Sequence, residues 1–293
     1  MRVVLLSYAE VLPDALASWR RAAAARPVEL VEVEPHLLRL HLPDRAAPRV
    51  LVGSDVLRAD AVVHRTVQPY RSLVQPVLEV LAAQGTVVLN DVGRALLSRS
   101  KVRTLLRLAE LGLPTVPTTA VAGPLSALDV RDLGADLVLK PSSGAQGRDV
   151  RRIPARELGD GREPGPWSAS DGPTLVQPLV RSPFDLRAYV VGGTCVALGQ
   201  RWHAPGDWRC NVALGGTVTP VDDDVLRARA EQLAVAAVDG LGLDHAAVDL
   251  LVDDGQPLLS EVDAWGGFVG LEGGLGVDVA GRVLDLAASR THA

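Results

Sequence analysis

The chain has 293 residues, of which 47% are hydrophobic and 22% charged, and its 30 basic and 35 acidic residues give a formal net charge of −5. At about 150 residues per domain, this length predicts roughly two domains or lobes. An acidic balance without basic runs excludes electrostatic binding to nucleic acid. Because no apolar run approaches the ~18 residues of a membrane span and no cleavage site follows the N-terminus, we expect a cytoplasmic protein with no membrane partner.

Lysine is almost absent from this chain. Of the 30 basic residues, 28 are arginine, and only Lys101 and Lys140 are lysine. Asparagine, at 90 and 211, is similarly scarce, so genomic base composition is the simplest cause. Under such pressure arginine replaces lysine wherever any long-stemmed cation serves. The two remaining lysines are therefore expected where a compact ammonium is needed, the alternative being chance survival at the surface. The two cysteines, Cys195 and Cys210, lack metal or redox spacing and read as ordinary buried thiols.

Strands and helices alternate in the first part of the chain, which predicts parallel βαβ units in an open α/β lobe. No glycine-rich dinucleotide motif follows the first strand, so this lobe is not expected to bind NAD. The predicted strands cover residues 2–7, 28–33, 61–66 and 86–90, and the predicted helices cover 13–25 and 71–84.

The remainder of the chain predicts two α+β lobes, so that the expected domains are residues 1–92, 93–176 and 177–293. Hairpins are expected to turn at Gly192-Gly193 and near Asp254-Gly255. The predicted helices cover 100–113, 125–133, 224–240 and 278–289; the predicted strands outside the hairpins cover 136–141, 149–153 and 174–180; and 154–173 is predicted to be a surface loop.

Three carboxylates in the second hairpin form the clearest constellation. Glu261 and Asp263 lie two residues apart and so share one face of a strand. Asp249 joins them if the turn has three residues, Asp254 to Gln256, whereas a two-residue turn sets Asp249 opposite Ser260 and on the other face. Converging carboxylates suit Mg²⁺ bound together with phosphates. The alternative is a solvated strand face.

A serine- and glycine-rich segment, residues 142–147, follows the strand that carries Lys140. Glycine lets backbone N–H groups approach an anion closely, so this segment suits a lid over phosphates. It lacks the Walker A pattern, and taken alone it reads as an ordinary turn. Lys101 lies in the first turn of a predicted helix, where backbone donors also favour an anion.

Four polar residues near the first hairpin have two interpretations: Arg187, Arg201, Arg209 and Asn211. They are ion-paired or solvated, with Asp207 available to Arg209, or they capture a carboxylate or phosphate. The tryptophans nearby in sequence, Trp202, Trp208 and Trp265, pack in a core or line a pocket. No spacing gives a role to His64, His203 or His245, and the motifs of serine hydrolases, zinc proteases and thioredoxins are absent from the sequence.

The order of these motifs resembles the ATP-grasp superfamily, and within it the RimK-type amino-acid ligases. The similarity extends from Asn90 to about Leu286, whereas the first 90 residues match only loosely. The segments that carry it are SK at 100–101, GLPTVPT at 112–118, LVLKPSSGAQGRDV at 137–150, LVQPLV at 175–180, FDLRAYVVGG at 184–193, GDWRCNVALGG at 206–216, AAVDLL at 246–251, LLSEVDAWGGFVGLE at 258–272 and GVDVAG at 276–281.

The resemblance implies a role for each candidate site residue. Lys101 and Lys140 would hold ATP phosphates under a lid that contains Gly144, Gln146 and Gly147. The interlobe linker Gln177, Pro178, Leu179 and Val180 would read adenine, with Asp185 near the ribose. Asp249, Glu261 and Asp263 would bind two Mg²⁺, for which Mn²⁺ can substitute, and this favours the three-residue turn. Arg201, Arg209 and Asn211 match positions near the γ-phosphate and the acyl phosphate, with Arg187 in support.

This sequence departs from the family pattern at three places. Asp263 stands where the family usually has asparagine, and Trp265-Gly266-Gly267 replaces its usual Ser-Pro-Gly. Pro178 removes one backbone donor from the adenine linker.

The resemblance implies an ATP-grasp fold and an ATP-dependent carboxylate–amine ligase that works through an acyl phosphate and releases ADP and phosphate. Phosphoryl transfer of this kind depends mainly on positioning the substrates and neutralising the phosphate charge, so no side-chain nucleophile is needed. The expected substrates are ATP, a small carboxylate and an amine, joined as an amino acid to another amino acid, a peptide or a metabolite. The alternatives are a ligase that modifies a protein tail or carrier protein, and a non-catalytic ATP-binding regulator. The sequence is also compatible with a homo-oligomer.

Overall fold

A computed structural model describes residues 1–7, 13–65, 70–131, 133–142, 149–159, 172–210 and 215–292. Its N-terminal part contains a parallel sheet in the order β2-β1-β6-β7. Alternate residues of β1 enter two different cores: Val3 and Leu5 pack toward α1 and α8, and Val4 and Leu6 pack toward α2. Helices therefore cover both faces, as the alternation of strands and helices predicts. The elements are β1 (Arg2–Leu6), α1 (Pro13–Ala24), β2 (Glu29–Val33), β6 (Ala61–His64), α2 (Arg71–Ala83) and β7 (Val87–Leu89).

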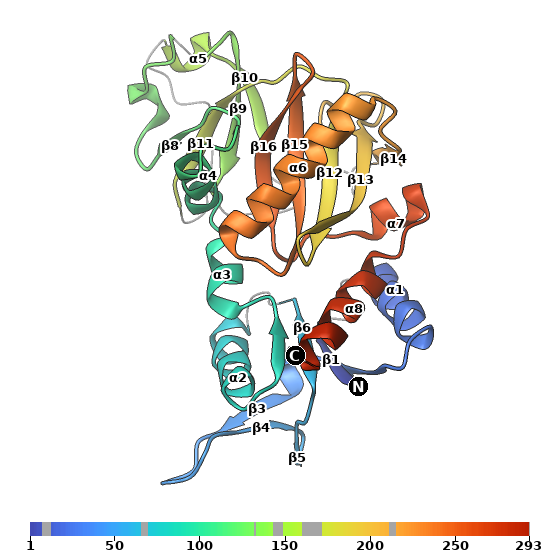
Figure 1. Cartoon of the computed structure of the whole chain (residues 1–293). Coiled ribbons are helices and arrows are strands. Elements are labelled where there is room, and N and C mark those ends of the chain that lie inside the picture. Colours follow the sequence, from blue (N-terminus) through green and yellow to red (C-terminus); the bar gives the residue numbers. More distant parts are fainter. Residues whose placement is uncertain are drawn as a thin grey trace.

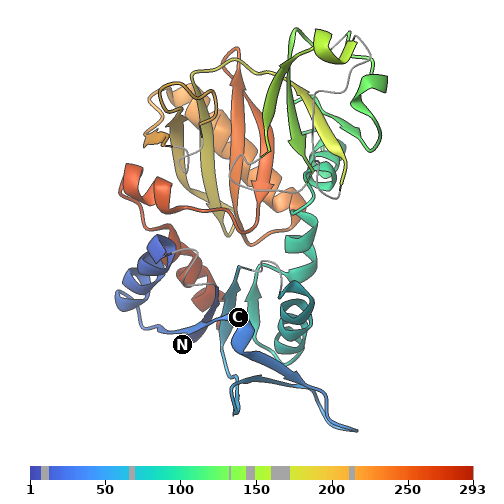
Figure 2. The same ribbon diagram turned by 180° about the vertical axis from the view of Figure 1, so that it is seen from behind.

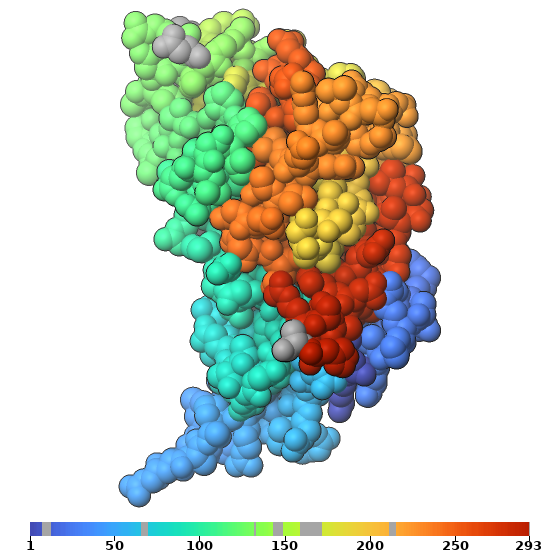
Figure 3. All heavy atoms as spheres, in the orientation of Figure 1, coloured from blue at the N-terminus to red at the C-terminus, as the bar shows by residue number. Residues whose placement is uncertain are grey.

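A small antiparallel sheet, β3-β4-β5, projects from this lobe as an arm (Figures 1 and 3). It is formed by β3 (Leu38–His41), β4 (Arg49–Val52) and β5 (Asp55–Val56), after a short 3₁₀ turn at Pro35–Leu37. The sequence reading did not predict it. Strands of two to four residues carry too little alternation to be separated from a loop.

The central lobe contains an antiparallel sheet in the order β10-β9-β11-β8. The predicted helix over 125–133 is wrong, because only a 3₁₀ turn, Leu125–Ala127, forms. The Asp129 side chain accepts a hydrogen bond from the backbone N–H of Arg131 at 3.1 Å, which competes with helical bonding. The elements are α3 (Val92–Leu97), α4 (Lys101–Glu110), β8 (Thr119–Val121), β9 (Asp136–Pro141), β10 (Arg151–Pro154), α5 (Arg156–Gly159) and β11 (Thr174–Pro178).

The C-terminal part is built on a five-stranded antiparallel sheet, β14-β13-β12-β15-β16. Helix α6 covers one face, which Figure 1 shows, and the opposite face is turned toward the candidate site. After α7, helix α8 returns to pack on the N-terminal sheet, as Figure 2 shows from behind. The elements are β12 (Phe184–Val191), β13 (Thr194–Trp202), β14 (Thr217–Thr219), α6 (Asp224–Leu241), β15 (His245–Asp253), β16 (Gln256–Asp263), α7 (Val269–Leu275) and α8 (Val279–Thr291).

The hairpin of β15 and β16 has a two-residue turn, so the three-residue turn favoured by the resemblance is wrong. Asp253 pairs with Gln256, and Asp254 and Gly255 have φ angles of 45° and 75°, which match a type I′ turn. A β-bulge then follows: Leu250 pairs with Leu259, but Asp249 pairs with Glu261, so Ser260 is the extra residue. The bulge restores the Asp249–Glu261 pairing that a regular two-residue hairpin would lose.

Asn90 connects the N-terminal lobe to the five-stranded sheet. Its side-chain oxygen accepts hydrogen bonds from the backbone N–H groups of Asp244 at 2.6 Å and His245 at 2.9 Å. Its amide nitrogen donates to the carbonyls of His245 and Ala264. His64 lies against the same residue, with Nε2 2.9 Å from the Asn90 carbonyl oxygen. All these groups are buried or nearly so, and the side-chain amide of Asn90 uses both its oxygen and its nitrogen in hydrogen bonds across the junction.

Across the described ranges, no helix combines the length and apolar character required to cross a membrane.

Candidate active site

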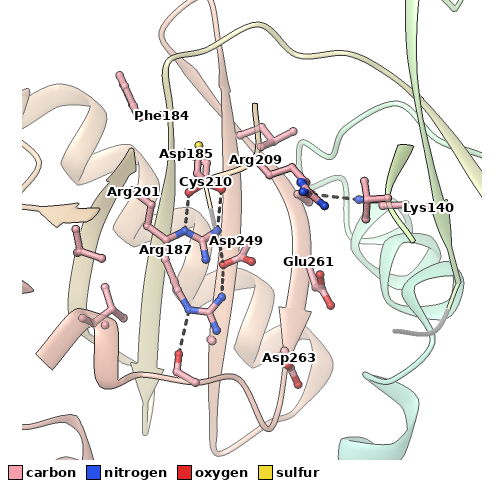
Figure 4. A pocket seen from close by; sticks show the side chains of 18 of the residues that line it. Lys140, Phe184, Asp185, Arg187, Arg201, Arg209, Cys210, Asp249, Glu261 and Asp263 are labelled. Atoms are coloured by element: carbon pink, nitrogen blue, oxygen red, sulfur yellow. Dashed lines mark hydrogen bonds and ion pairs between the residues drawn. The ribbon is translucent and has the colours of Figure 1, made fainter. Parts of the chain in front are cut away.

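A cavity of about 600 Å³ lies on the face of the five-stranded sheet that α6 leaves open, and its volume is that of a typical ligand pocket. Its walls come from the N-terminal, central and C-terminal lobes. Figure 4 shows the part in which charged side chains of the five-stranded sheet face Lys140 of the central lobe. The lining includes most described site residues that the sequence reading singled out: Lys101, Lys140, Gln177, Pro178, Leu179, Val180, Asp185, Arg187, Arg201, Arg209, Asp249, Glu261 and Asp263.

Sheet register explains why the charged side chains meet. Arg187 on β12 pairs with Asp249 on β15, and Asp249 pairs in turn with Glu261 on β16. On the other side of β12, Asp185 pairs with Arg201 of β13. Cross-strand partners have their side chains on the same face, so four strands present a continuous row of charged side chains, in which arginines alternate with carboxylates up to the neighbouring acids Asp249 and Glu261.

Ion pairs join this row tightly. Arg187 Nη1 lies 2.7 Å from Asp249 Oδ1, and Arg201 Nη2 lies 3.2 Å from the same oxygen. Arg201 also forms a two-pronged pair with Asp185, at 2.6 and 2.8 Å. Burial alone would raise the pKa of Asp249, but the two guanidinium groups outweigh it and hold that pKa below its usual value. Asp249 is therefore a carboxylate at neutral pH, held between two cations.

The two lysines lie close to the row, on the side of the central lobe. Lys101, in the first turn of α4, places Nζ 2.8 Å from Glu261 Oε1. Lys140, near the end of β9, donates from Nζ to Ser260 Oγ at 3.3 Å. Lys140 is 8% exposed, and burial is the main cause that lowers the pKa of its ammonium to about 8. Because the bulge turns both Ser260 and Glu261 into the cavity, each lysine meets a partner there.

The carboxylates do not form a compact metal-binding group in this conformation. Within the described ranges, no three His, Cys, Asp or Glu side chains gather closely enough to hold a metal ion. Instead, Arg187 and Arg201 bind Asp249, and Lys101 binds Glu261. The donor set nevertheless fits Mg²⁺, because carboxylate oxygens from paired strands line one cavity.

The four-residue linker proposed to read adenine, 177–180, begins inside β11 and has few free backbone N–H groups. Gln177 is buried and donates from Nε2 to Thr118 Oγ1 at 2.7 Å. The Leu179 N–H donates to the Asp136 carbonyl at 2.9 Å. Pro178 has no N–H. Within the four-residue linker, Val180 is left to offer a backbone donor to a ligand.

Arg209 follows its ion-paired interpretation in this structure, since Asp207 binds it with Nη2 2.9 Å from Oδ2. Trp208 lines the cavity, whereas Trp265 is buried and lies against His64. Burial raises the pKa of the Cys210 thiol to about 11, which agrees with an unreactive cysteine. Asn211 and the lid residues Gly144, Gln146 and Gly147 lie outside the described residues.

The segment that departs from the family pattern has a packing reason. A Cβ at Gly266 would lie 2.3 Å from Ala247 Cβ and 2.9 Å from Arg187 Nη2, so a side chain there would displace the arginine. Arg187 also donates from Nε to the Gly267 carbonyl at 3.1 Å. Gly266 therefore lets the segment close over Arg187, whereas a Cβ at Gly267 would meet nothing within 4 Å in the described part of the chain.

The sequence reading missed Arg65 and Ser260. Arg65 directly follows β6, a central strand of the parallel sheet, and reaches the cavity from the N-terminal lobe. Its position after the carboxyl end of a parallel strand was the available signal, because ligands bind at that edge. Ser260 had no comparable signal, since the bulge that exposes it does not show in a hairpin of regular alternation.

Comparison with known proteins gives the family. The sequence matches the family described as RimK-like ATP-grasp domain over residues 99–287. The chain belongs to this family. A curated relative from Shewanella amazonensis, named a probable alpha-L-glutamate ligase 1, is 30% identical over all of this chain and 97% of its own length.

Solved structures share the fold. The ATP-grasp ligase PsnB, in a complex with a minimal precursor, aligns with a TM-score of 0.77 and 22% identity over 99% of this chain and 98% of its own. A RimK domain ATP-grasp protein from Sphaerobacter thermophilus aligns with a TM-score of 0.69 and 24% identity over 98% of this chain and 99% of its own. The ATP-grasp fold expected from the sequence is thereby confirmed.

Membership makes the chain an enzyme: an ATP-dependent ligase that forms carbon–nitrogen bonds between a carboxylate and an amine. The family uses ATP together with Mg²⁺.

Proposed function

We propose that this RimK-like enzyme transfers the γ-phosphoryl group of ATP to a carboxylate, and that an amine then attacks the acyl phosphate to give an amide and phosphate. The substrates are proposed to be an amino acid and a second amino acid, peptide or small metabolite. The observation that carries the proposal is the cavity itself, where six cations and four strand carboxylates line one space of about 600 Å³.

The nucleotide is proposed to extend from the linker to the lysines. Adenine would use the Val180 backbone, since the Leu179 N–H is already bonded to Asp136. The phosphates would meet Lys140, which no carboxylate neutralises among the described residues. A buried ammonium beside Ser260 is costly on its own, and an anion that pairs with it recovers much of that cost.

Ion-pair exchange is proposed to accompany nucleotide binding. In this structure Lys101 binds Glu261, and Arg187 and Arg201 bind Asp249. Phosphate oxygens that pair with these cations would free the carboxylates of Asp249 and Glu261, which together with Asp263 would hold Mg²⁺. Two ions, with Mn²⁺ as a substitute, are proposed; when bound, they neutralise charge on the phosphate oxygens. Arg201, and Arg209 once released from Asp207, would stabilise the charge that develops on the transferred group.

Purified full-length chain with Mg-ATP and pairs of amino acids tests the proposal. We expect phosphate release only when both a carboxylate and a suitable amine are present, with the amide found by mass spectrometry. Lys140→Arg is the matched variant, because it keeps the charge and changes its shape; turnover should fall at least tenfold. Measurable ATP binding without phosphate release for any pair would instead favour a non-catalytic ATP-binding protein.

A further inference from the structure

The cavity contains two cations that no carboxylate neutralises within the described part of the chain. Of its six lining cations, four have a carboxylate oxygen within 4.0 Å, namely Lys101, Arg187, Arg201 and Arg209. The two others, Lys140 and Arg65, belong to different lobes. Proposed phosphate binding accounts for Lys140. Arg65 is left with a charge that the nucleotide proposal does not use.

Arg65 is fixed where it can meet a ligand. Its backbone N–H donates to the Leu6 carbonyl at 2.9 Å, which extends the β1–β6 pairing by one residue and anchors the side chain at the cavity wall. The side chain is half-buried, and burial is the main cause that lowers the pKa of its guanidinium. Asp263 attracts it, and Arg187 repels it. A desolvated guanidinium with no ion pair is a strong site for a planar carboxylate.

The surroundings of Arg65 suit a small organic group. Apart from the carboxylates of Asp14 and Asp263, the lining contributed by α1 and by the segment from the end of β16 into α7 is short or apolar: Pro13, Ala15, Gly267, Val269, Gly270 and Leu271. Arg187, the cation that repels Arg65, is already bound to Asp249 and the Gly267 carbonyl. Arg65 is therefore the cation at this end with unused donor capacity among the described residues.

The direction of attack indicates which substrate lies here. In the proposed reaction the acyl phosphate faces the nucleotide, so the amine must approach from the side that the nucleotide leaves open. Arg65 lines the cavity from the N-terminal lobe, whereas Lys101 and Lys140, the proposed phosphate ligands, line it from the central lobe. Resting on the proposed function, we propose that Arg65 binds a carboxylate of the amine substrate that stays free in the product. The amine substrate is thus an amino acid or a peptide with a nearby free carboxylate, not a simple amine.

Binding and turnover together test this proposal. The full-length enzyme, saturated with Mg-AMPPNP, is titrated calorimetrically with the twenty amino acids and with their carboxamides. We expect at least one amino acid to bind at least tenfold more tightly than its carboxamide. Arg65→Gln should weaken that amino acid about 10- to 100-fold and abolish the preference over the carboxamide, while the Kd of Mg-AMPPNP stays within twofold. Arg65→Lys should recover part of the affinity.

Arg39→Gln is the matched control, since Arg39 lies on the projecting arm and donates to the Gly53 carbonyl outside the cavity. Arg39→Gln should change neither the affinity for the amino acid nor the affinity for Mg-AMPPNP. The proposal is overturned if carboxamides bind as tightly as the acids, if no amino acid binds, if Arg65→Gln leaves the affinity unchanged, or if it weakens Mg-AMPPNP equally. Carboxylate binding that depends on Arg65 without any ATP turnover would uphold this inference and overturn the proposed function, so the two failures are distinguishable.

Discussion

Lys140 is a buried cation whose retention as lysine indicates that the cavity needs a compact ammonium at this position. It is one of only two lysines among 30 basic residues, and it lies buried at the end of β9 with Ser260 as its hydrogen-bond partner. Base composition explains why arginine replaced lysine elsewhere, and burial explains why an exchange here would be costly. A guanidinium is larger and needs five donors satisfied in a plane, which a single hydroxyl does not offer.

The pKa of Lys140 predicts a pH dependence of nucleotide binding. With the pKa of the free enzyme at about 8, the ammonium loses its proton as the pH rises through 8, and a cation is lost from the phosphate site. We expect the Kd of Mg-AMPPNP to be constant below pH 7 and to rise above pH 8. In Lys140→Arg the different shape of the guanidinium should lower the affinity for Mg-AMPPNP at every pH. Because the guanidinium stays charged, the affinity of this variant should show no inflection near pH 8. Calorimetric titrations between pH 6.5 and 9.5 check this. A flat curve for the native enzyme, or an unchanged inflection in the variant, contradicts it.

Arg65 and Ser260 mark the residue-scale limit of sequence reading. Composition singled out the two lysines and hairpin spacing the acids and arginines, and the family motifs then implied a role for each. Arg65 lies in the loosely matching N-terminal region, and Ser260 is brought into the cavity by a backbone irregularity. Neither position is fixed by residue type alone.

At the scale of elements, the hairpin of β15 and β16 determines the geometry of the site. Its type I′ turn sets a register that would separate Asp249 from Glu261, and the bulge at Ser260 brings them together again. The bulge also places two consecutive residues, Ser260 and Glu261, toward the lysines. Turn and bulge therefore act as a pair.

Gly255 supplies a test of that turn. Its φ is 75°, and nothing in the described part of the chain lies within 4 Å of the position that a Cβ would take, so Gly255→Ala changes backbone strain without a clash. We expect the free energy of unfolding to fall by about 1–2 kcal/mol in urea denaturation. Gly123→Ala is the matched control, with equally open space and no left-handed backbone, and should change stability by less than about 0.5 kcal/mol. Equal losses in the two variants would show that the turn is not held by this conformation.

Sequence periodicity predicted most elements but not their pairing. The helix at 13–25, the strand at 136–141 and the helix at 224–240 were expected from hydrophobic spacing and agree with α1, β9 and α6. The residues of the hairpin alone did not decide the register of β15 and β16, because the same sequence fits both a two-residue and a three-residue turn. The projecting arm and the 3₁₀ turn at Leu125–Ala127 were missed or misassigned because short segments are decided by side-chain competition and tertiary contacts.

On the scale of the whole molecule, three lobes meet around one cavity, and a buried polar junction joins two of them. Asn90 bridges the N-terminal lobe to His245 and Ala264, and His245 Nδ1 lies 3.0 Å from the Tyr189 hydroxyl. Two histidines that the sequence reading left without a role are thus part of the junction. Helix α8 completes it by packing the end of the chain on the first lobe.

The junction predicts acid sensitivity of the fold. Burial is the main cause that lowers the pKa of His64 to about 4 and that of His245 to about 3, from 6.5. Each histidine is neutral in the folded protein but takes up a proton when the protein unfolds below pH 6.5. Its contribution to the free energy of unfolding is therefore fully present above pH 6.5 and is lost as the pH falls toward the folded-state pKa. The slope approaches ~1.4 kcal/mol per pH unit for each histidine.

Urea denaturation between pH 5 and 7.5 measures that slope. His64→Gln should lower the free energy of unfolding at every pH. Below pH 6.5 that free energy should also depend less steeply on pH, by the ~1.4 kcal/mol per pH unit that one titrating histidine contributes, because glutamine does not titrate in this range. His36→Gln is the control, since His36 lies beside the projecting arm and is half exposed. An identical slope in the native protein and in His64→Gln would contradict the account.

The central claim is that the carboxylate of one substrate receives the γ-phosphoryl group of ATP. The most direct measurement uses a productive pair in which that carboxylate carries ¹⁸O in both positions, with Mg-ATP and the full-length enzyme, and determines the mass of the released phosphate. Attack on phosphorus followed by amine attack on the acyl carbon transfers one carboxylate oxygen to phosphate. We predict one ¹⁸O atom in each phosphate released, one in the amide, and ADP as the nucleotide product. Unlabelled phosphate, or AMP with labelled carboxylate oxygen, would contradict the account.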